Sequence, residues 1–381
     1  MKRKLNLLIA PLALLSLVFT ACDKDDVNTP PPSATAAWAE LGTGANALNA
    51  NGNINMVRTD ASGNVYATGS FTNSSGKQYI AKWDGTTWTE LGTGANALNA
   101  NNNITAITTD ASGNMYATGN FSNVLGLQYV AKWNGTTWAE LGTGLGALNA
   151  NGNINSITTD ASGNMYATGS FTNLSGNRYV AKWNGLTWAE LGTGANALGA
   201  NGSINSIKTD ASGNVYATGN FTNSAGKRYI AKWDGTAWTE LGTGANALNA
   251  NGSIQAITTD AAGNIYAAGS FTNGSSNNYV AKWNGTTWTE LGTNLNANGA
   301  INSIHVDASN NIYVAGNYTA GGRQVVSKWD GSTWTSLGTS SSLMNNNISS
   351  ISTDASGNVY AAGSFTNSAG KYYVARFGSQ P

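Results

Sequence analysis

The chain has 381 residues, of which 47 are glycine and only 10% are charged, and its formal net charge at pH 7 is zero. Without a basic leader that contains Lys2, Arg3 and Lys4 the rest is slightly acidic, which excludes the basic face that nucleic-acid binding requires. The single cysteine, Cys22, excludes an intrachain disulfide and every thiol site that needs two cysteines.

Residues 1–21 have the pattern of a signal peptide. A basic start is followed by an apolar stretch over residues 5–19, and Thr20 and Ala21 are small residues before Cys22. The run Phe-Thr-Ala-Cys resembles the lipobox of bacterial lipoproteins, in which the cysteine takes a diacylglycerol and becomes the new N-terminus. This resemblance implies attachment to a membrane through a lipid on Cys22. The alternative is an ordinary secretory signal with an incidental cysteine.

Residues 22–37 form a predicted tether. Its acidic start, Asp-Lys-Asp-Asp at 23–26, resembles the export signal that sends some lipoproteins to the outer surface, although a solvated spacer would look the same. Three prolines at 30–32 favour extended polyproline geometry, which would hold a following domain away from the membrane. We therefore expect a surface-exposed lipoprotein of the bacterial outer membrane.

Residues 38–378 repeat with a period of 50 residues that shortens near the end. A repeated aspartate shows the seven copies at positions 60, 110, 160, 210, 260, 307 and 354. Repeats of this length are typical of propeller blades. The sequence predicts an all-β fold, namely a seven-bladed β-propeller of four-stranded antiparallel blades.

The first complete repeat shows the expected blade. Its predicted strands cover residues 54–59, 64–71, 78–83 and 88–92. Asp60 and Gly63 favour a turn after the first strand. An Asp84-Gly85 type I′ turn and a Gly85-Thr86 type II′ turn are both open, and either places Trp83 and Trp88 on one face as a cross-strand pair.

The phase of the repeat predicts how the ring closes. The first copy begins with a lone fourth strand at 38–41, and the last copy stops after its third strand at 373–377. Each end lacks what the other has. We expect the N-terminal strand to complete the last blade, which would leave no open edge.

The segment Gly-Asn-Val-Tyr-Ala-Thr-Gly-Ser-Phe, with a tryptophan 22 residues after its tyrosine, resembles bacterial kelch-like repeats over residues 38–378. The resemblance implies the closed propeller. Where kelch repeats have two glycines, this chain has Thr-Gly or Ala-Gly, as at Thr68-Gly69. A fold does not assign a function.

Few residues break the repeat pattern with catalytic chemistry. His305, the only histidine, shares its place in the repeat with Arg58 and Lys208 and with hydroxyl residues elsewhere, which predicts solvated positions near the central channel. A copper site resembling that of galactose oxidase is excluded because it needs several histidines. The repeated Asp of each turn is expected to form the turn and not to bind calcium. We expect no metal and no cofactor.

Two further recurring residue types are interpreted structurally. Glutamates at 40, 90, 140, 190, 240 and 290 are spread around the outer strands, too far apart for paired-carboxylate hydrolysis, and we expect solvated rim charges. The recurring tryptophans are expected to pack between blades.

The loop after the second strand varies between copies, and propeller geometry places it on the same face as the long connection between blades. Loops on a rigid scaffold commonly bind ligands, although unconstrained drift would also vary them. The candidate ligand-binding positions are Lys77, Gln78, Gln128, Asn177, Arg178, Lys227, Arg228, Asn277, Asn278, Arg323 and Lys371.

The resulting hypothesis is a monomeric, surface-tethered, non-enzymatic binding or adhesion module for a glycan or a protein partner. One alternative is a polysaccharide hydrolase or lyase that uses the channel residues Arg58, Lys208 and His305. Another is a purely structural repeat protein.

Overall fold

The computed structural model describes residues 36–338 and 343–378. The leader, Cys22 and all but the last two residues of the predicted tether lie outside these ranges. Within them, no helix is long and apolar enough to cross a membrane.

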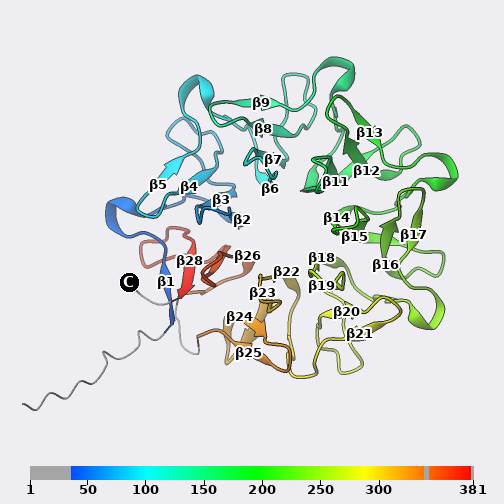
Figure 1. Ribbon diagram of the computed structural model, residues 1–381. Helices are drawn as coiled ribbons and strands as arrows, with labels where there is room; N and C mark the ends of the chain where they lie inside the picture. The colour runs from blue at the N-terminus through cyan, green and yellow to red at the C-terminus, as the bar shows by residue number, and fades with distance from the viewer. Residues whose placement is uncertain (1–35, 339–342, 379–381) are drawn as a thin grey trace, which may run out of the picture. The chain divides into compact units, whose positions relative to one another are not determined.

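The part of the chain from Ala36 onward forms a ring of seven four-stranded antiparallel sheets (Figure 1). Their innermost strands line a central channel. Blades 1 to 3 are β2(Ile54–Thr59), β3(Val65–Gly69), β4(Ala81–Trp83), β5(Trp88–Glu90); β6(Ile104–Thr109), β7(Met115–Gly119), β8(Ala131–Trp133), β9(Trp138–Glu140); and β10(Ile154–Thr159), β11(Met165–Thr172), β12(Arg178–Trp183), β13(Trp188–Glu190). Blades 4 to 6 are β14(Ile204–Thr209), β15(Val215–Thr222), β16(Arg228–Trp233), β17(Trp238–Glu240); β18(Ile254–Thr259), β19(Ile265–Gly269), β20(Ala281–Trp283), β21(Trp288–Glu290); and β22(Ile301–Val306), β23(Ile312–Ala320), β24(Arg323–Trp329), β25(Trp334–Ser336). The predicted fold is confirmed.

The seventh blade is the predicted composite. Its strands are β26(Ile348–Thr353), β27(Val359–Gly363), β28(Ala375–Gly378) and, at the outer edge, β1(Ala37–Glu40). Trp38 lies opposite Phe377 in this antiparallel pair, and its ring nitrogen donates to the carbonyl oxygen of Leu337 at 2.7 Å. The N-terminal strand therefore closes the ring, as the phase of the repeat predicted.

The core lies between neighbouring blades. Every residue of β3 is buried, because this second strand is covered on both faces, and one apolar cluster joins Phe71 of blade 1 to Tyr360 of blade 7. Gly69 is required at the end of β3, since a Cβ there would overlap the carbonyl oxygen of Asn53. This steric demand explains why the second residue of the Thr-Gly or Ala-Gly pair is always glycine.

The turn between the third and fourth strands pairs two tryptophans. The ring centroids of Trp83 and Trp88 lie 5.7 Å apart at an interplanar angle of 51°, which confirms the cross-strand pair. Gly85 has a φ of 105° and Asp84 does not have a positive φ, which favours the Gly85-Thr86 turn. The indole nitrogen of Trp88 donates to the carbonyl oxygen of Leu41 in the preceding connection, so these tryptophans join neighbouring blades.

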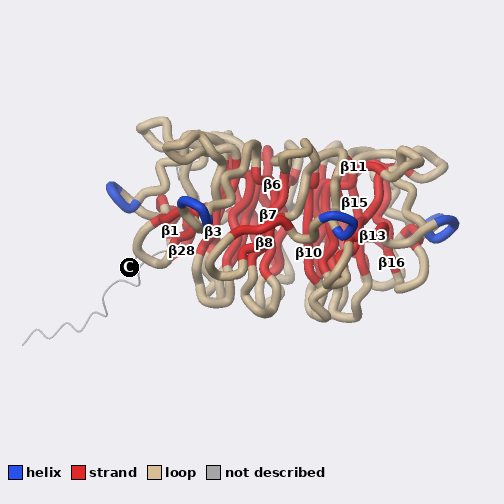
Figure 2. The backbone as a smooth tube through the Cα atoms, turned by 90° about the horizontal axis from the view of Figure 1, so that it is seen from above, coloured by secondary structure: helices blue, strands red, loops and turns tan. Residues whose placement is uncertain are grey.

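The connections between blades run differently from the expectation. Each of five begins with a short 3-10 helix at the outer rim of the ring (Figures 1 and 2). These helices are η1(Gly44–Asn46), η2(Gly94–Asn96), η3(Gly144–Gly146), η4(Gly194–Asn196) and η5(Gly244–Asn246). Only the second half of a connection reaches the face of the loops, where Ala100 pairs with Gln78 through the backbone.

Candidate functional site

The loop between the second and third strands has one fixed anchor in six blades. In blade 1 the side-chain oxygen of Asn73 accepts from the backbone N–H groups of Ser75 and Lys77, and its amide nitrogen donates to the carboxylate of Glu90 at 3.1 Å. The same anchors are Asn123, Asn173, Asn223, Asn273 and Asn367. The loop backbone is thus held alike while the exposed tip residues vary. We call the face that carries these loops the loop face and the opposite one the turn face.

The rim glutamates are more constrained than solvated charges. Glu90 is half-buried, and burial raises the pKa of its carboxyl against the opposing effect of the Asn73 hydrogen bond. Glu40 reaches Asn367 in the same way across the closure of the ring. Each glutamate therefore joins the fourth strand to the loop of its own blade.

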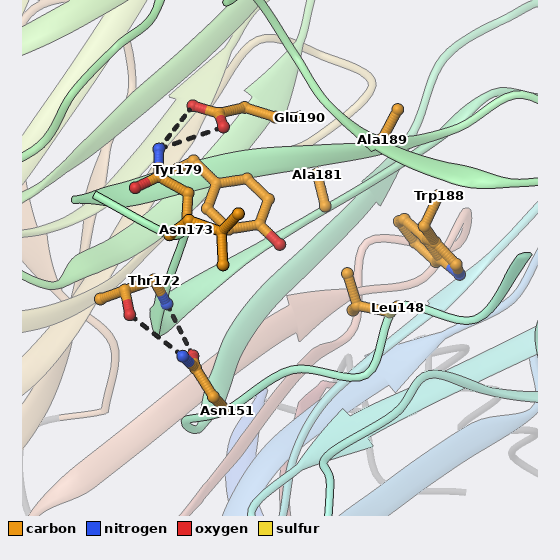
Figure 3. A pocket seen from close by; sticks show the side chains of 10 residues that line it. Leu148, Asn151, Thr172, Asn173, Tyr179, Ala181, Trp188, Ala189 and Glu190 are labelled. Atoms are coloured by element: carbon orange, nitrogen blue, oxygen red, sulfur yellow. Dashed lines mark hydrogen bonds between the residues drawn. The ribbon is translucent and has the colours of Figure 1, made fainter. Parts of the chain in front are cut away.

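A pocket lies beside this anchor at the outer edge of the blade. In blade 3 it has a volume of about 320 Å³ and lies among Leu148, Asn173, Tyr179, Trp188 and Glu190 (Figure 3). The equivalent pocket of blade 1 has a volume of about 140 Å³ and is lined by Leu48, Asn73, Tyr79, Trp88 and Glu90. We call this repeated cavity the rim pocket.

Two contacts orient the aromatic side chains of the rim pocket in blade 3. The ring of Tyr179 packs edge-on against Phe171 at a centroid distance of 4.9 Å. The indole nitrogen of Trp188 donates to the carbonyl oxygen of Leu141 at 2.9 Å, which leaves the ring as an apolar wall. Both rings are therefore positioned before any ligand arrives.

The hydroxyl of Tyr179 makes no hydrogen bond to another described residue. Burial, and then the nearby charge of Glu190, raise its pKa, so the hydroxyl stays protonated and is able to donate. The carboxylate of Glu190 accepts beside it. The rim pocket thus combines an apolar wall, one free donor and one carboxylate acceptor.

Blade 6 lacks this constellation. Val325 stands where the other blades have tyrosine, Ser336 replaces the glutamate, and the loop is one residue shorter, closing directly between Ala320 and Arg323. This blade nevertheless forms its four strands normally. The asparagine, tyrosine and glutamate of the rim pocket are thus present or absent together, and the fold does not need them.

The candidate loop residues fall into three groups. Lys77, Asn177, Lys227, Arg323 and Lys371 are exposed at the loop tips. Gln78, Gln128, Arg178, Arg228 and Asn277 are half-buried, and all but Asn277 of this group pair through the backbone with the next connection. Asn278 is buried and donates to the carbonyl oxygens of Gly269 and Phe271.

Several exposed apolar side chains occur on the loops of blades 2 and 3. Val124 and Leu125 occupy the tip of one loop, and Leu174 occupies the equivalent tip beside the rim pocket of blade 3. The other five copies carry Ser, Gly or Ala at the place of Leu174. The entrance of the rim pocket is therefore more apolar in blade 3 than in blade 1.

The channel brings together the three basic residues that the sequence singled out. Arg58, Lys208 and His305 line one cavity of about 350 Å³ formed by the innermost strands. No aspartate or glutamate is among the described residues that line it. The ring nitrogen Nε2 of His305 lies 2.9 Å from the hydroxyl of Thr353.

The turn face contains the repeated aspartate. One carboxylate oxygen of Asp60 accepts from the backbone of Ser62 and Asn64, and the other accepts from the side chains of Asn64 and Tyr66. This is the predicted turn-forming role, with the tyrosine as an unforeseen partner. Across residues 36–338 and 343–378 no group of three metal-ligating side chains gathers.

Comparison with known proteins identifies the fold alone. No family model matches the chain, and no curated protein matches it. The structure is similar to a streptogramin B lyase, with 14% identity, a TM-score of 0.57, and coverage of 92% of this chain and 100% of that one.

Two surface proteins are similar at the same level. One is the extracellular domain of a hybrid two-component system from B. thetaiotaomicron, with 13% identity, a TM-score of 0.58 and coverage of 91% of this chain; the chain spans 40% of its length. The other is PorZ, a surface component of the type-IX secretion system of Porphyromonas gingivalis, with 16% identity, a TM-score of 0.57, and coverage of 84% of this chain and 46% of that one.

Proposed function

We propose that the protein is a non-enzymatic, surface-tethered binding module that holds a glycan in its rim pockets. The observation that carries this proposal is an amphipathic pocket found in blades 1 and 3, whose asparagine, tyrosine and glutamate recur in six of the seven blades. Extracellular and surface proteins among the structural relatives support a role outside the cell.

The chemistry of the rim pocket matches a sugar better than a peptide backbone or a charged ligand. A sugar ring offers an apolar face of C–H groups and hydroxyls that both donate and accept. Trp188 supplies the apolar wall, the hydroxyl of Tyr179 donates, and the carboxylate of Glu190 accepts. The exposed loop tips, such as Asn177 in the loop that Asn173 anchors, would contact neighbouring sugar units.

Repetition compensates for weak single sites. Each pocket is small and open, so one pocket alone would bind a sugar weakly. Several equivalent pockets on a rigid ring would bind a repeating polysaccharide with an avidity well above the affinity of one site. A lipid on Cys22 would hold the ring at the surface, where such a polymer is met.

The test uses the full-length protein on a glycan array and in titrations with the best-bound polysaccharide. Replacing the six rim glutamates by serine, the residue of blade 6, should abolish binding. The matched control replaces Asp84, Asp234 and Asp330 on the turn face by asparagine, which other blades already carry there. This control should bind as the natural protein does.

The outcomes separate the candidate functions. Binding that survives the six replacements, or that is absent from every glycan, contradicts the proposal. Capture of one defined protein by the loop tips would support the protein-partner alternative, and no binding of either kind would support a structural role. The hydrolase or lyase alternative lacks a carboxylate in the described channel lining.

The anchorage has its own test. Metabolic labelling with a fatty acid should label the chain and should not label a Cys22→Ser variant. Protease added to intact cells should degrade the protein if it lies on the outer surface. Size-exclusion chromatography should give a monomer.

A further inference from the structure

One level of the channel differs from the sevenfold pattern. On the innermost strands, Arg58, Lys208 and His305 each lie opposite a tyrosine of the neighbouring second strand, namely Tyr66, Tyr216 and Tyr313. The four other blades carry a hydroxyl residue at this position: Thr108, Thr158, Thr258 and Ser352. Three basic residues therefore replace hydroxyls at a single height of the channel.

These three residues are spread around the ring. They belong to blades 1, 4 and 6, so neighbouring basic residues are separated by three, two and two blades. No arrangement of three positions among seven blades is more even. The side chains thus approach the same cavity from different sides, and a ligand at this level would be surrounded by them.

The positive charge of this level is not neutralised by the protein. Neither Arg58 nor Lys208 makes a side-chain hydrogen bond or an ion pair with another described residue, and the described lining contains no carboxylate. Burial, and then the charge of Arg58, lower the pKa of Lys208 to about 8. The group is still mostly protonated at pH 7, so the cavity holds two cations that repel each other.

His305 responds to the same field. Burial, followed by the charges of Lys208 and Arg58, lowers its pKa to about 4, and only Asp307 acts in the opposite direction. An anion in the cavity would oppose these effects and favour the protonated imidazole. Binding of an anion would therefore be accompanied by uptake of a proton at mildly acidic pH.

We propose that this level of the channel binds a small multivalent anion, bearing carboxylate, phosphate or sulfate groups, between Arg58, Lys208 and His305. Arg58 and Lys208 supply fixed positive charge, and the hydroxyl of Thr258, which also lines the cavity, is placed to donate. The fold does not require the basic residues, because threonine or serine occupies the same position in four blades. The site is separate from the rim pockets.

The test is calorimetric titration of the full-length protein with citrate at pH 6, with acetate at equal ionic strength as the monovalent comparison. Citrate should saturate at one per chain, and acetate should give no saturating signal. Arg58→Thr and Lys208→Thr, which introduce the residue of other blades, should each weaken citrate binding at least tenfold. Lys77→Asn, which copies the loop tip of blade 3, should leave citrate binding unchanged.

A second measurement covers the role of His305 and the folding of the variants. Sulfate, whose charge is constant over this range, should bind more tightly as the pH falls from 7 to 5, and His305→Thr should remove most of that dependence. Without anions at low salt, the Arg58→Thr variant should melt no lower than the natural protein. The proposal would be overturned, whatever the glycan experiments show, if the Arg58→Thr and Lys208→Thr variants bound citrate as tightly as the natural protein does, or if citrate and acetate gave equal signals.

Discussion

In every blade except blade 6, each end is fixed by a side-chain oxygen that accepts hydrogen bonds from its own loop or turn, but the two ends differ in what these contacts leave free. On the turn face Asp60 fixes its turn by accepting four hydrogen bonds, all from its own blade, so its oxygens are occupied. On the loop face Asn73 fixes its loop and passes one bond to Glu90, whose carboxylate remains half-exposed beside the free hydroxyl of Tyr79. On the turn face the hydrogen-bonding capacity of the carboxylate is used within the blade, so this face has a structural role. In the rim pocket some donors and acceptors have no protein partner, so the pocket is able to bind a ligand.

Both faces of blade 7 depend on β1, and its loss should have the largest effect. Deleting residues 37–41 removes the outer strand, the hydrogen bond that Asn367 donates to Glu40 and the buried ring of Trp38, which is 7% exposed. Burial of that ring alone is worth about 3 to 5 kcal/mol. We expect a much lower melting temperature in circular dichroism and association through the open edge of β28. A synthetic peptide of residues 36–42 should restore part of the loss; an unchanged melting temperature would contradict this closure.

Asp60→Ala should destabilise the protein without affecting binding. It leaves the hydroxyl of Tyr66 and the side-chain amide of Asn64 without their acceptor, which costs about 1 to 2 kcal/mol in a partly exposed turn. Urea unfolding measures the change. Asp84→Ala removes the same charge from an exposed turn of the same face and should cost less; equal losses would show that the internal network adds nothing.

The two faces should differ in their response to pH. Burial raises the pKa of Asp60, but hydrogen bonds from Asn64 and Tyr66 outweigh it and hold the pKa below its usual value. Since the folded pKa lies below the unfolded one, the stabilisation is complete above about pH 4 and is lost as the pH falls through the folded pKa. Asp110, Asp210 and Asp260 behave alike.

Glu90 has the opposite sign, because burial raises its folded pKa. Its contribution is present at low pH and is lost as the pH rises through that pKa. Urea unfolding at pH 7 and pH 3.5 should therefore show less acid destabilisation for a variant with these four aspartates changed to asparagine, and slightly greater stability at pH 7 for Glu90→Gln. If both variants changed the free energy of unfolding at pH 7 in the same direction, the distinction between the turn aspartates and Glu90 would be contradicted.

The smallest effect comes from a matched pair of tyrosines. Tyr373 of blade 7 donates to the carbonyl oxygen of Leu343, whereas Tyr179 at the same place in blade 3 has no such partner. Tyr373→Phe should cost about 1 kcal/mol of unfolding free energy, and Tyr179→Phe should stay within about 0.5 kcal/mol of the natural protein. Loss of glycan binding by Tyr179→Phe at unchanged stability would assign its hydroxyl to the ligand.

Most of the fold follows from the sequence because its signals are local and repeated. The turn at Asp60, the paired rings of Trp83 and Trp88, and the closure by β1 rest on spacing and phase alone. The path of the connections was predicted incompletely, since the segment Gly-Ala-Asn at 44–46 has no sequence pattern that predicts a 3-10 helix at the rim.

The rim pocket was not predicted, because its partners meet only in the folded blade. Asn173 and Glu190 are 17 residues apart, and a charged residue on an outer strand is ordinarily solvated. A signal was nevertheless present in the sequence. Asparagine, tyrosine and glutamate recur together in six of the seven copies, and all three are missing from the copy that forms blade 6. The three basic channel residues were singled out from the sequence and line one cavity in the structure, but their even spacing around the ring requires the order of the blades.

The composite blade also has a consequence for the order of folding. β1 leaves the ribosome before any blade exists, and its partner β28 is made last, so this pairing has the largest sequence separation in the ring. Until then the only third strands available to β1 carry Ala-Lys-Trp, or Ser-Lys-Trp in blade 6, in place of the Ala-Arg-Phe of β28. Each of those strands is joined by a short turn to its own fourth strand, which competes at a far higher effective concentration. Ring closure should thus be the last and slowest step of folding. A chain truncated before residue 375 would lack β28 and could not pair it with β1 to close the ring.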